Sequence, residues 1–343
     1  MSTLQIINEK NSAVELSFSK LTQICGCNIY LKNYAMRYIS KYFSKKKYNE
    51  DELEIYSGDY PKVLIDGEVV SRSRYDCIHI TSVEDIEHEL MFLKDSALYK
   101  YILSSFQTVD ISANINTIDD AILKIANSFE SNINFKTDLF NNIKIQPTPI
   151  DKEIILKNFV SANVTNNGLY LNYMTGFQKL NLYLQLQQEL SKTDPNLKLV
   201  LISNIEKIIK KEEVQRFDDL VRNLLECNVH FIVESSTKEY ILGTASDIEN
   251  INILSNINAS MPNIHTLTDT INRNYPTNKI FSEQKVYNIF KRIANNLFDS
   301  KYTYSYTEDD VILKILNSFY DVNCTHNESI TLSEKIFLKS SEI

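Results

Sequence analysis

Residues 21–33 read LTQICGCNIYLKN, which places an apolar strand, a glycine-containing loop and the start of a helix in direct succession. The loop keeps two positions of the phosphate-binding pattern GxxxxGK[ST], namely the first glycine, Gly26, and the lysine, Lys32. Leu31 and Asn33 stand where that pattern has its second glycine and its hydroxyl residue. A leucine strains a loop that wraps phosphate with backbone N–H groups, and an asparagine removes the hydroxyl ligand of magnesium. The stretch therefore predicts a degenerate phosphate loop, although one glycine and one lysine at this spacing also occur by coincidence.

A second unit, from residue 197 to residue 233, has the pattern of strand, helix and strand. Two apolar runs, residues 197–202 and 229–233, flank an amphipathic helix over residues 214–225. A unit of this kind predicts two parallel strands joined by a right-handed crossover. The first run resembles the strand that ends in the magnesium-binding carboxylate of an NTPase, but Ser203 and Asn204 occupy that end. The phosphate loop and the magnesium-binding strand both lack residues that catalysis needs, so we do not expect an active NTPase.

The chain as a whole has the pattern of an α/β protein with two helical additions. We assign residues 1–90 and 175–262 to a head of the phosphate-loop-NTPase type with a parallel sheet, because strand-like and helix-like segments alternate there. Residues 91–174 carry apolar side chains at helical spacing and are the predicted helical leg, inserted into the head. Residues 263–343 are the predicted C-terminal helical extension.

The stretch from residue 243 to residue 276 interrupts this pattern. It is polar and rich in asparagine and serine. Such a composition predicts a linker or an irregular region rather than a strand or a helix. Helical patterns return over residues 286–297 and 311–319.

Composition restricts the class of protein. The 343 residues are 43% hydrophobic and 23% charged, as in ordinary globular proteins. No run of 18 apolar residues occurs, and residues 1–10 are polar and lack the apolar segment of a signal peptide. The five cysteines show no zinc-site spacing and fit buried positions in a reducing compartment. We therefore expect a cytoplasmic protein with no membrane partner.

The charge balance bears on a nucleic-acid partner. The net charge of −8 does not itself indicate one, so DNA binding requires a local basic patch. Two clusters are candidates, one after the strand that ends at residue 202 and one after the first helix: Lys207, Lys210 and Lys211, and Lys45, Lys46 and Lys47. Lysines bind the phosphate backbone without reading base sequence. A run of lysines is more often only a solvated face, so the clusters alone do not decide the function.

The order of these features resembles a family of CRISPR-associated proteins. A degenerate phosphate loop, a helical insertion and a strand–helix–strand unit follow one another as in the DNA-end-binding ring protein of type II-A systems, the accessory subunit of spacer acquisition. The similarity covers residues 14–243 and is one of arrangement, since no short invariant motif supports it. The length of the chain matches the long variants of the family, which carry a C-terminal extension.

This resemblance implies further properties. Members of the family form homotetrameric rings whose basic hole admits linear double-stranded DNA, and they act beside the CRISPR integrase complex and the RNA-guided effector nuclease. The resemblance also implies calcium sites and no bound nucleotide. Glu130 and Asp138 keep acidic positions of the matching leg segment, whereas Asn134 and Lys136 interrupt it.

The resulting hypothesis is a non-catalytic protein that binds the ends of linear double-stranded DNA as a homotetrameric ring and supports spacer acquisition in type II-A CRISPR immunity. One alternative is a divergent nucleotide-binding NTPase or kinase-like enzyme that uses Lys32. Another is a protein-interaction scaffold whose C-terminal helices dock a partner. A basic ring predicts DNA binding that falls steeply with salt and that prefers linear duplexes to closed circles.

Overall fold

The protein is described from a computed structural model, which places residues 2–7, 14–44, 47–50, 62–107, 110–136, 145–194, 196–299, 307–322 and 332–339. Its centre is a six-stranded sheet in the order β12-β11-β3-β10-β9-β6. All neighbouring strands are parallel except β12, which is antiparallel to β11. The strands span Leu21–Cys25 (β3), Tyr75–Ile80 (β6), Leu197–Ile202 (β9), Val229–Glu234 (β10), Ile251–Leu254 (β11) and Asn258–Ser260 (β12). The α/β class with a parallel sheet is therefore confirmed.

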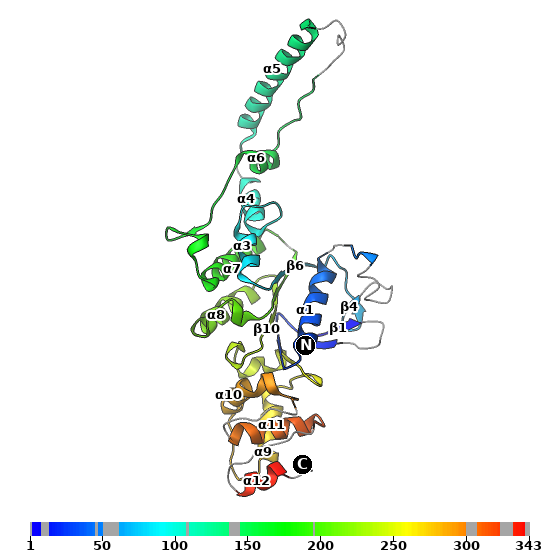
Figure 1. Cartoon of the computed structure of the whole chain (residues 1–343), viewed down its shortest axis with the longest axis vertical. Helices are drawn as coiled ribbons and strands as arrows, with labels where there is room; N and C mark the ends of the chain where they lie inside the picture. Colours follow the sequence, from blue (N-terminus) through cyan, green and yellow to red (C-terminus); the bar gives the residue numbers. More distant parts are fainter. Residues whose placement is uncertain are drawn as a thin grey trace.

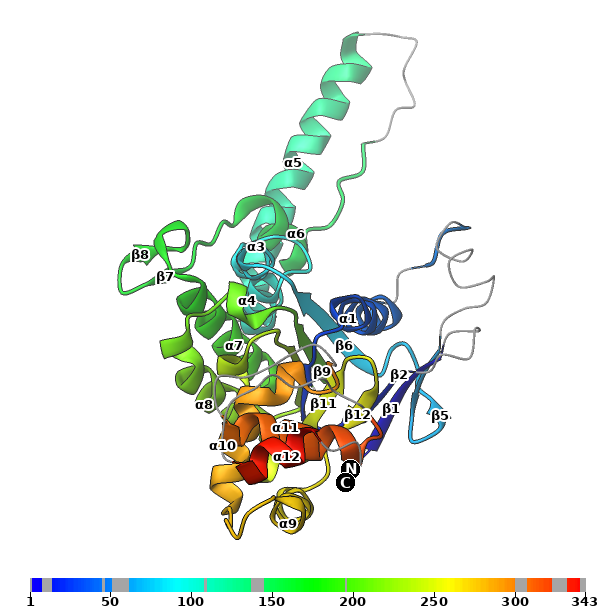
Figure 2. The same ribbon diagram turned by 60° about the horizontal axis from the view of Figure 1, so that its bottom comes forward.

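Helices cover both faces of this sheet. The predicted strand–helix–strand unit is confirmed, since α8 (Val214–Leu225) connects β9 to the parallel strand β10. Side chains of β9 alternate between the faces, as the two-residue period of a strand requires. Leu199 and Leu201 pack with α1 (Ile29–Phe43), whereas Val200 and Ile202 pack with α8 and with the helices α3 (Val83–Leu90) and α7 (Gly176–Thr193). Figure 2 shows α1 on one side of the sheet and α7 and α8 on the other.

A second, antiparallel sheet packs beside α1. Its order is β2-β1-β4-β5, with bounds Ser2–Ile7 (β1), Val14–Phe18 (β2), Lys62–Ile65 (β4) and Glu68–Val69 (β5). From the sequence, residues 1–10 were described only as polar, because a short alternation of apolar and polar residues is all that indicates β1. Its two apolar alternate residues, Leu4 and Ile6, are fully buried and share a core with α1.

The helical insertion projects from the head. It comprises α4 (Ala97–Gln107), α5 (Ser112–Lys136), α6 (Lys152–Phe159) and a small hairpin of β7 (Thr165–Asn166) and β8 (Leu169–Tyr170). The long helix α5 forms one end of the elongated molecule (Figure 1). α4 and α3 pack against α7, which anchors the insertion on the head.

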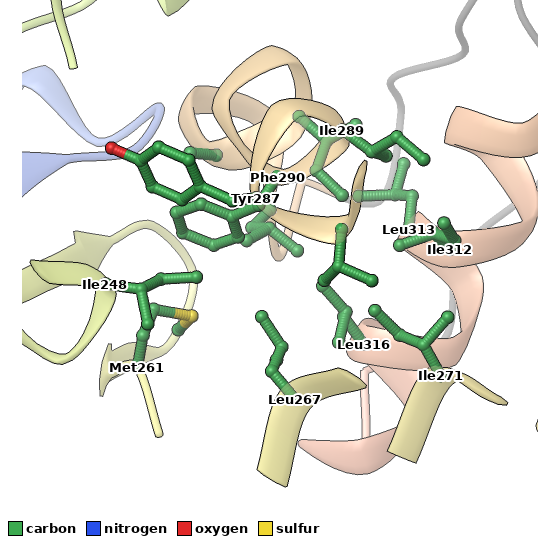
Figure 3. Packing of buried hydrophobic residues seen from close by; sticks show 14 of the residues in the cluster. Ile248, Met261, Leu267, Ile271, Tyr287, Ile289, Phe290, Ile312, Leu313 and Leu316 are labelled. Carbon is green, nitrogen blue, oxygen red and sulfur yellow. The ribbon is translucent and has the colours of Figure 1, made fainter. Parts of the chain in front are cut away.

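The expectation of a linker over residues 243–276 is wrong. This stretch contains β11, which pairs with β3 near the centre of the protein, and α9 (Ile264–Asn274). Three more helices follow: α10 (Glu283–Ile293), α11 (Thr307–Phe319) and α12 (Leu332–Lys339). Figure 3 shows Ile248 and Met261 from this polar stretch packed with Phe290 and Leu316 of the helices. Isolated apolar residues among asparagines and serines thus build a core that periodicity does not reveal.

Short 3-10 segments complete the described structure. They span Leu171–Tyr173, Ile205–Lys207, Lys211–Glu213, Lys238–Tyr240, Ala245–Asn250 and Ala294–Asn296. Of the helices that the structure describes, none combines the length and the hydrophobicity that crossing a bilayer requires.

Candidate functional site

The candidate site lies at the carboxyl edge of the parallel strands, where open α/β sheets bind their ligands. The loop after β3 contains Gly26, whose φ of +111° favours glycine. A Cβ atom at this position would lie 2.2 Å from the carbonyl oxygen of Leu254 at the end of β11. Asn28 begins α1, and its side chain accepts a hydrogen bond from the N–H of Leu31 at 3.0 Å. Only glycine therefore fits at position 26, because β11 passes too close to leave room for a side chain.

The same loop uses its N–H groups within the protein. In a phosphate loop these groups point at the ligand. Here three successive N–H groups have acceptors within the protein. Gly26 donates to Asn295 Oδ1 (3.2 Å) in the 3-10 segment Ala294–Asn296, Cys27 to Ser255 Oγ (3.1 Å) just after β11, and Asn28 to the carbonyl of Leu254 (3.1 Å) at the end of β11. The donors that would bind a phosphate already have partners.

Lys32 is also engaged within the protein. Its side chain is fully buried, and its Nζ lies 3.0 Å from Oε1 of Glu234, the last residue of β10. Lys32 Nζ also donates to Ser236 Oγ at 2.6 Å and to the Ser235 carbonyl at 3.2 Å. The other carboxylate oxygen of Glu234 accepts from the N–H of Asn204 at 2.8 Å. The lysine of the predicted phosphate loop therefore binds an anion that the protein supplies.

Acidic and polar groups continue along this edge. Glu206 Oε1 accepts from the N–H of Ser236 at 3.0 Å, and burial, followed by the charge of Glu234, raises the pKa of the Glu206 carboxyl. Asn204 adopts a left-handed backbone with φ of +50°, which asparagine tolerates. Ser203 Oγ lies 2.9 Å from His79 Nε2, and burial lowers the pKa of that imidazole. Ser203 is only 4% exposed, whereas His79 is half-buried.

The structure places only some of the predicted site residues. Asn33 is half-buried in α1, next to Lys32. The lysines that follow β9 are exposed, and Nζ of Lys211 lies 3.7 Å from Glu239 Oε1. Lys47 is exposed beyond α1, whereas Lys45 and Lys46 lie outside the described residues. Of the six predicted DNA-binding lysines, the structure therefore describes four, and all four are exposed.

The predicted calcium ligands are not brought together in the described structure. Glu130 lies on α5, and its Oε2 accepts from the N–H of Ile145 at 3.2 Å. Asp138 lies outside the described residues. Among the residues that the structure places, no three histidine, cysteine, aspartate or glutamate side chains gather as a metal site would require. The calcium ligands therefore remain a prediction.

Sequence analysis missed the partner of Lys32. Glu234 ends a buried strand, and a lone carboxylate at the end of the run VHFIVE was the available signal. A charged residue that ends a buried strand at the carboxyl edge of a parallel sheet points towards a site or an ion pair. Which cation it meets depends on the packing of α1 against β10, which no local pattern encodes.

Comparison with known proteins identifies the family of this chain. The model of the family described as CRISPR-associated protein Csn2, subfamily St, matches residues 7–340. The chain belongs to this family. The resemblance proposed from sequence is therefore confirmed, and Csn2 membership supports an accessory role in type II-A CRISPR systems.

Solved structures agree with this assignment at the level of the fold. The crystal structure of Stu0660 of Streptococcus thermophilus matches with a TM-score of 0.85 and 23% identity, over 98% of this chain and 99% of that one. The SMC head domain from Thermotoga maritima matches with a TM-score of 0.37 and 13% identity, over 76% of this chain and 98% of that one. The Smc head domain from Pyrococcus furiosus, bound to the C-terminal domain of ScpA, matches with a TM-score of 0.39 and 12% identity, over 77% and 94%. These two scores are too low to support an inference. No curated protein matches the sequence.

Proposed function

We propose that this Csn2 protein is a non-catalytic, sequence-independent binder of linear double-stranded DNA ends, that it works as a homotetrameric ring, and that it supports the acquisition of new spacers. It acts in this role beside the CRISPR integrase complex and the RNA-guided effector nuclease. Calcium is the proposed metal, and no nucleotide takes part. The head is a degenerate relative of the phosphate-loop NTPases.

The buried pair of Lys32 and Glu234 carries the non-catalytic part of the proposal. A nucleotide would have to displace a carboxylate held at 3.0 Å from the only loop lysine and at 2.8 Å from the N–H of Asn204. It would also have to compete with the partners of the N–H groups of Gly26, Cys27 and Asn28. Breaking a buried ion pair leaves uncompensated charges, at a cost of about 3–5 kcal/mol. This favours the DNA binder over the divergent NTPase.

The proposal of DNA binding rests on Csn2 membership together with basic side chains at the head. Lysine charges give affinity that is independent of base sequence and sensitive to salt. The exposed candidates are Lys207, Lys210 and Lys211 after β9 and Lys47 after α1. Lys45 and Lys46, which lie outside the described residues, are the other candidates of the second cluster. In a closed ring, several copies of such residues surround one duplex, and closure retains the DNA.

The test compares linear and covalently closed circular duplexes of one sequence. We expect tight binding of the linear duplex and at least about tenfold weaker binding of the circle, with affinity of the linear form falling steeply between 50 and 200 mM salt. Fluorescence anisotropy of labelled linear DNA, with unlabelled circles as competitor, measures both. Blunt duplexes of two unrelated sequences serve as the control for sequence independence.

Two results would contradict the proposal. Equal competition by circles and linear DNA would remove the recognition of ends. Turnover of ATP by purified protein at an enzymatic rate, abolished in a Lys32→Ala variant, would replace the proposal with the nucleotide-dependent alternative.

A further inference from the structure

The segment that forms β3 and α1 carries an unusual charge distribution. Residues 16–49 contain seven lysines and arginines and no aspartate or glutamate, in a chain whose net charge is −8. Acidic residues return at Glu50. Of these cations, Lys32 is turned inward to Glu234. The surface of α1 is therefore basic even though the protein as a whole is acidic.

Exposed and half-buried side chains of α1 follow one face of the helix. Tyr30, Asn33, Arg37 and Lys41 are spaced three or four residues apart, which places them on the same face. Tyr30 is 90% exposed and Arg37 is exposed, and Arg37 forms no ion pair with the described residues. α1 lies along β6, the edge strand of the central sheet. These basic and aromatic residues thus form one stripe on α1, which lies beside β6 in Figure 2.

The turn before β6 extends this stripe. The Tyr42 hydroxyl, near the end of α1, donates to the carbonyl of Val70, which fixes the turn against the helix. Within the turn, the guanidinium of Arg72 lies 5.2 Å from the ring centroid of Tyr48, and Lys41 Nζ lies 5.3 Å from the same ring.

Arg74 continues the turn, with its guanidinium 5.7 Å from the ring centroid of Tyr75. Arg74 is exposed. Contacts of this kind hold cations in place at little cost to their charge. The next acidic residue, Asp76, is already shared by Lys100 (3.5 Å) and Lys198 (3.9 Å).

The lysine cluster after β9 has a different balance. Residues 204–213 contain three lysines and three glutamates, so their charges cancel. Lys211 also lies 3.7 Å from Glu239. The net attraction of this cluster for the phosphate backbone is therefore weaker than that of the α1 surface.

We propose that the exposed face of α1, together with residues 70–74, is the surface that contacts the phosphate backbone of the duplex. This inference rests on the proposed function and assigns its binding surface. Arg37 and Arg74 supply the direct phosphate contacts, Lys41 and Arg72 supply cations held over Tyr48, and Tyr30 packs against the sugar-phosphate backbone. A helix of 15 residues is about 22 Å long, which spans several phosphates of one strand.

The test uses two double variants with the same change in net charge. Arg37→Glu with Arg74→Glu alters the proposed surface, and Arg216→Glu with Arg273→Glu, at exposed arginines of α8 and α9, is the matched control. We expect the first to weaken binding of a linear duplex by at least about tenfold and to reduce the slope of log affinity against log salt by about two, as expected for two lost phosphate contacts. The control should change affinity by less than about threefold, since neither arginine lies on the proposed surface.

The neutral variant Arg37→Gln with Arg74→Gln, together with thermal unfolding of all forms, separates lost contacts from lost folding. Equal losses in both charge-reversal variants, or an unchanged salt slope in the neutral variant, would overturn the assigned surface while leaving DNA binding intact. Tighter binding of single-stranded RNA than of the duplex would overturn it as well. Failure of the unaltered protein to bind duplex DNA would instead reject the proposed function itself.

Discussion

Lys32 makes a buried ion pair at the position where the sequence predicts a phosphate-binding lysine. Its ammonium and the Glu234 carboxylate are both nearly inaccessible to water, with side-chain exposures of 1% and 3%. A buried ion pair stabilises the fold little more than apolar side chains of the same size would, but removing one partner leaves the other charge buried and unpaired. The pair therefore fixes the packing of α1 against β10 and engages the lysine that a phosphate loop would offer to its ligand.

We expect Lys32→Met to lower the free energy of unfolding by about 3–5 kcal/mol, because the Glu234 carboxylate stays buried without its cation. The double variant Lys32→Met with Glu234→Gln should lose less than the single variant, since no charge is left unpaired. Urea unfolding followed by circular dichroism measures both. Lys207→Met, at an exposed lysine, is the control and should change stability by less than about 0.5 kcal/mol. A loss of under about 1 kcal/mol in Lys32→Met would show that the pair does not stabilise the head.

Among the elements, β11 joins parts of the protein that sequence analysis kept apart. Asn252 in this strand is 1% exposed, and its side chain reaches across to β2 of the small sheet. Its Oδ1 accepts from the N–H of Ser17 at 2.7 Å, and its Nδ2 donates to the Ser17 carbonyl at 3.0 Å. Nδ2 also lies 3.3 Å from the Gln23 carbonyl in β3. One amide group thus links the two sheets.

Replacing this amide tests the link. Asn252→Ala should lower the free energy of unfolding by about 1–3 kcal/mol, because the Ser17 carbonyl loses the donor Nδ2 and the Ser17 N–H keeps only Ser260 Oγ, 3.1 Å away. Asn258→Ala, at an exposed asparagine of β12, is the matched control and should have an effect within about 0.5 kcal/mol. Chemical unfolding at neutral pH compares the two. Equal effects would mean that the connection between the sheets does not depend on Asn252.

How well the sequence predicts these elements depends on how clear the hydrophobic pattern of each one is. β9, α8 and β10 were predicted because long apolar runs and an amphipathic helix are bounded by polar residues. β11 was missed because its four residues include an asparagine and are flanked by serines and asparagines, so no apolar run is visible. β1 was missed because only two apolar residues, Leu4 and Ile6, alternate with polar ones there.

The site, too, was only partly predictable from the sequence. Gly26 and Lys32 were recognised from their spacing after a strand. Their partners, Leu254 and Glu234, are distant in sequence, so only the folded chain brings them together. The sequence therefore predicted an altered phosphate loop, but not which groups contact Gly26 and Lys32.

At the scale of the whole molecule, the elongated shape leaves apolar side chains uncovered. α5 projects from the head and exposes Ile118 (41%), Leu123 (47%), Ile125 (56%) and Phe129 (60%). Apolar surface of this extent on a projecting helix is characteristic of a protein contact. In the proposed homotetramer, such side chains would be covered by other copies of the chain.

Solution mass tests this interpretation. We expect the protein to have four times the 39.7 kDa of one chain, and a chelator of calcium should lower the mass if the proposed metal stabilises the ring. Ile125→Lys with Phe129→Lys should dissociate the assembly, since burying two lysines in an apolar contact costs several kcal/mol. Asn116→Lys with Asn127→Lys adds the same charge at exposed polar positions of α5 and should leave the mass unchanged. Light scattering coupled to gel filtration measures all four conditions. An unaltered protein that runs as a monomer with calcium present, or an apolar-face variant that keeps the full mass, would exclude α5 as the contact that closes the ring.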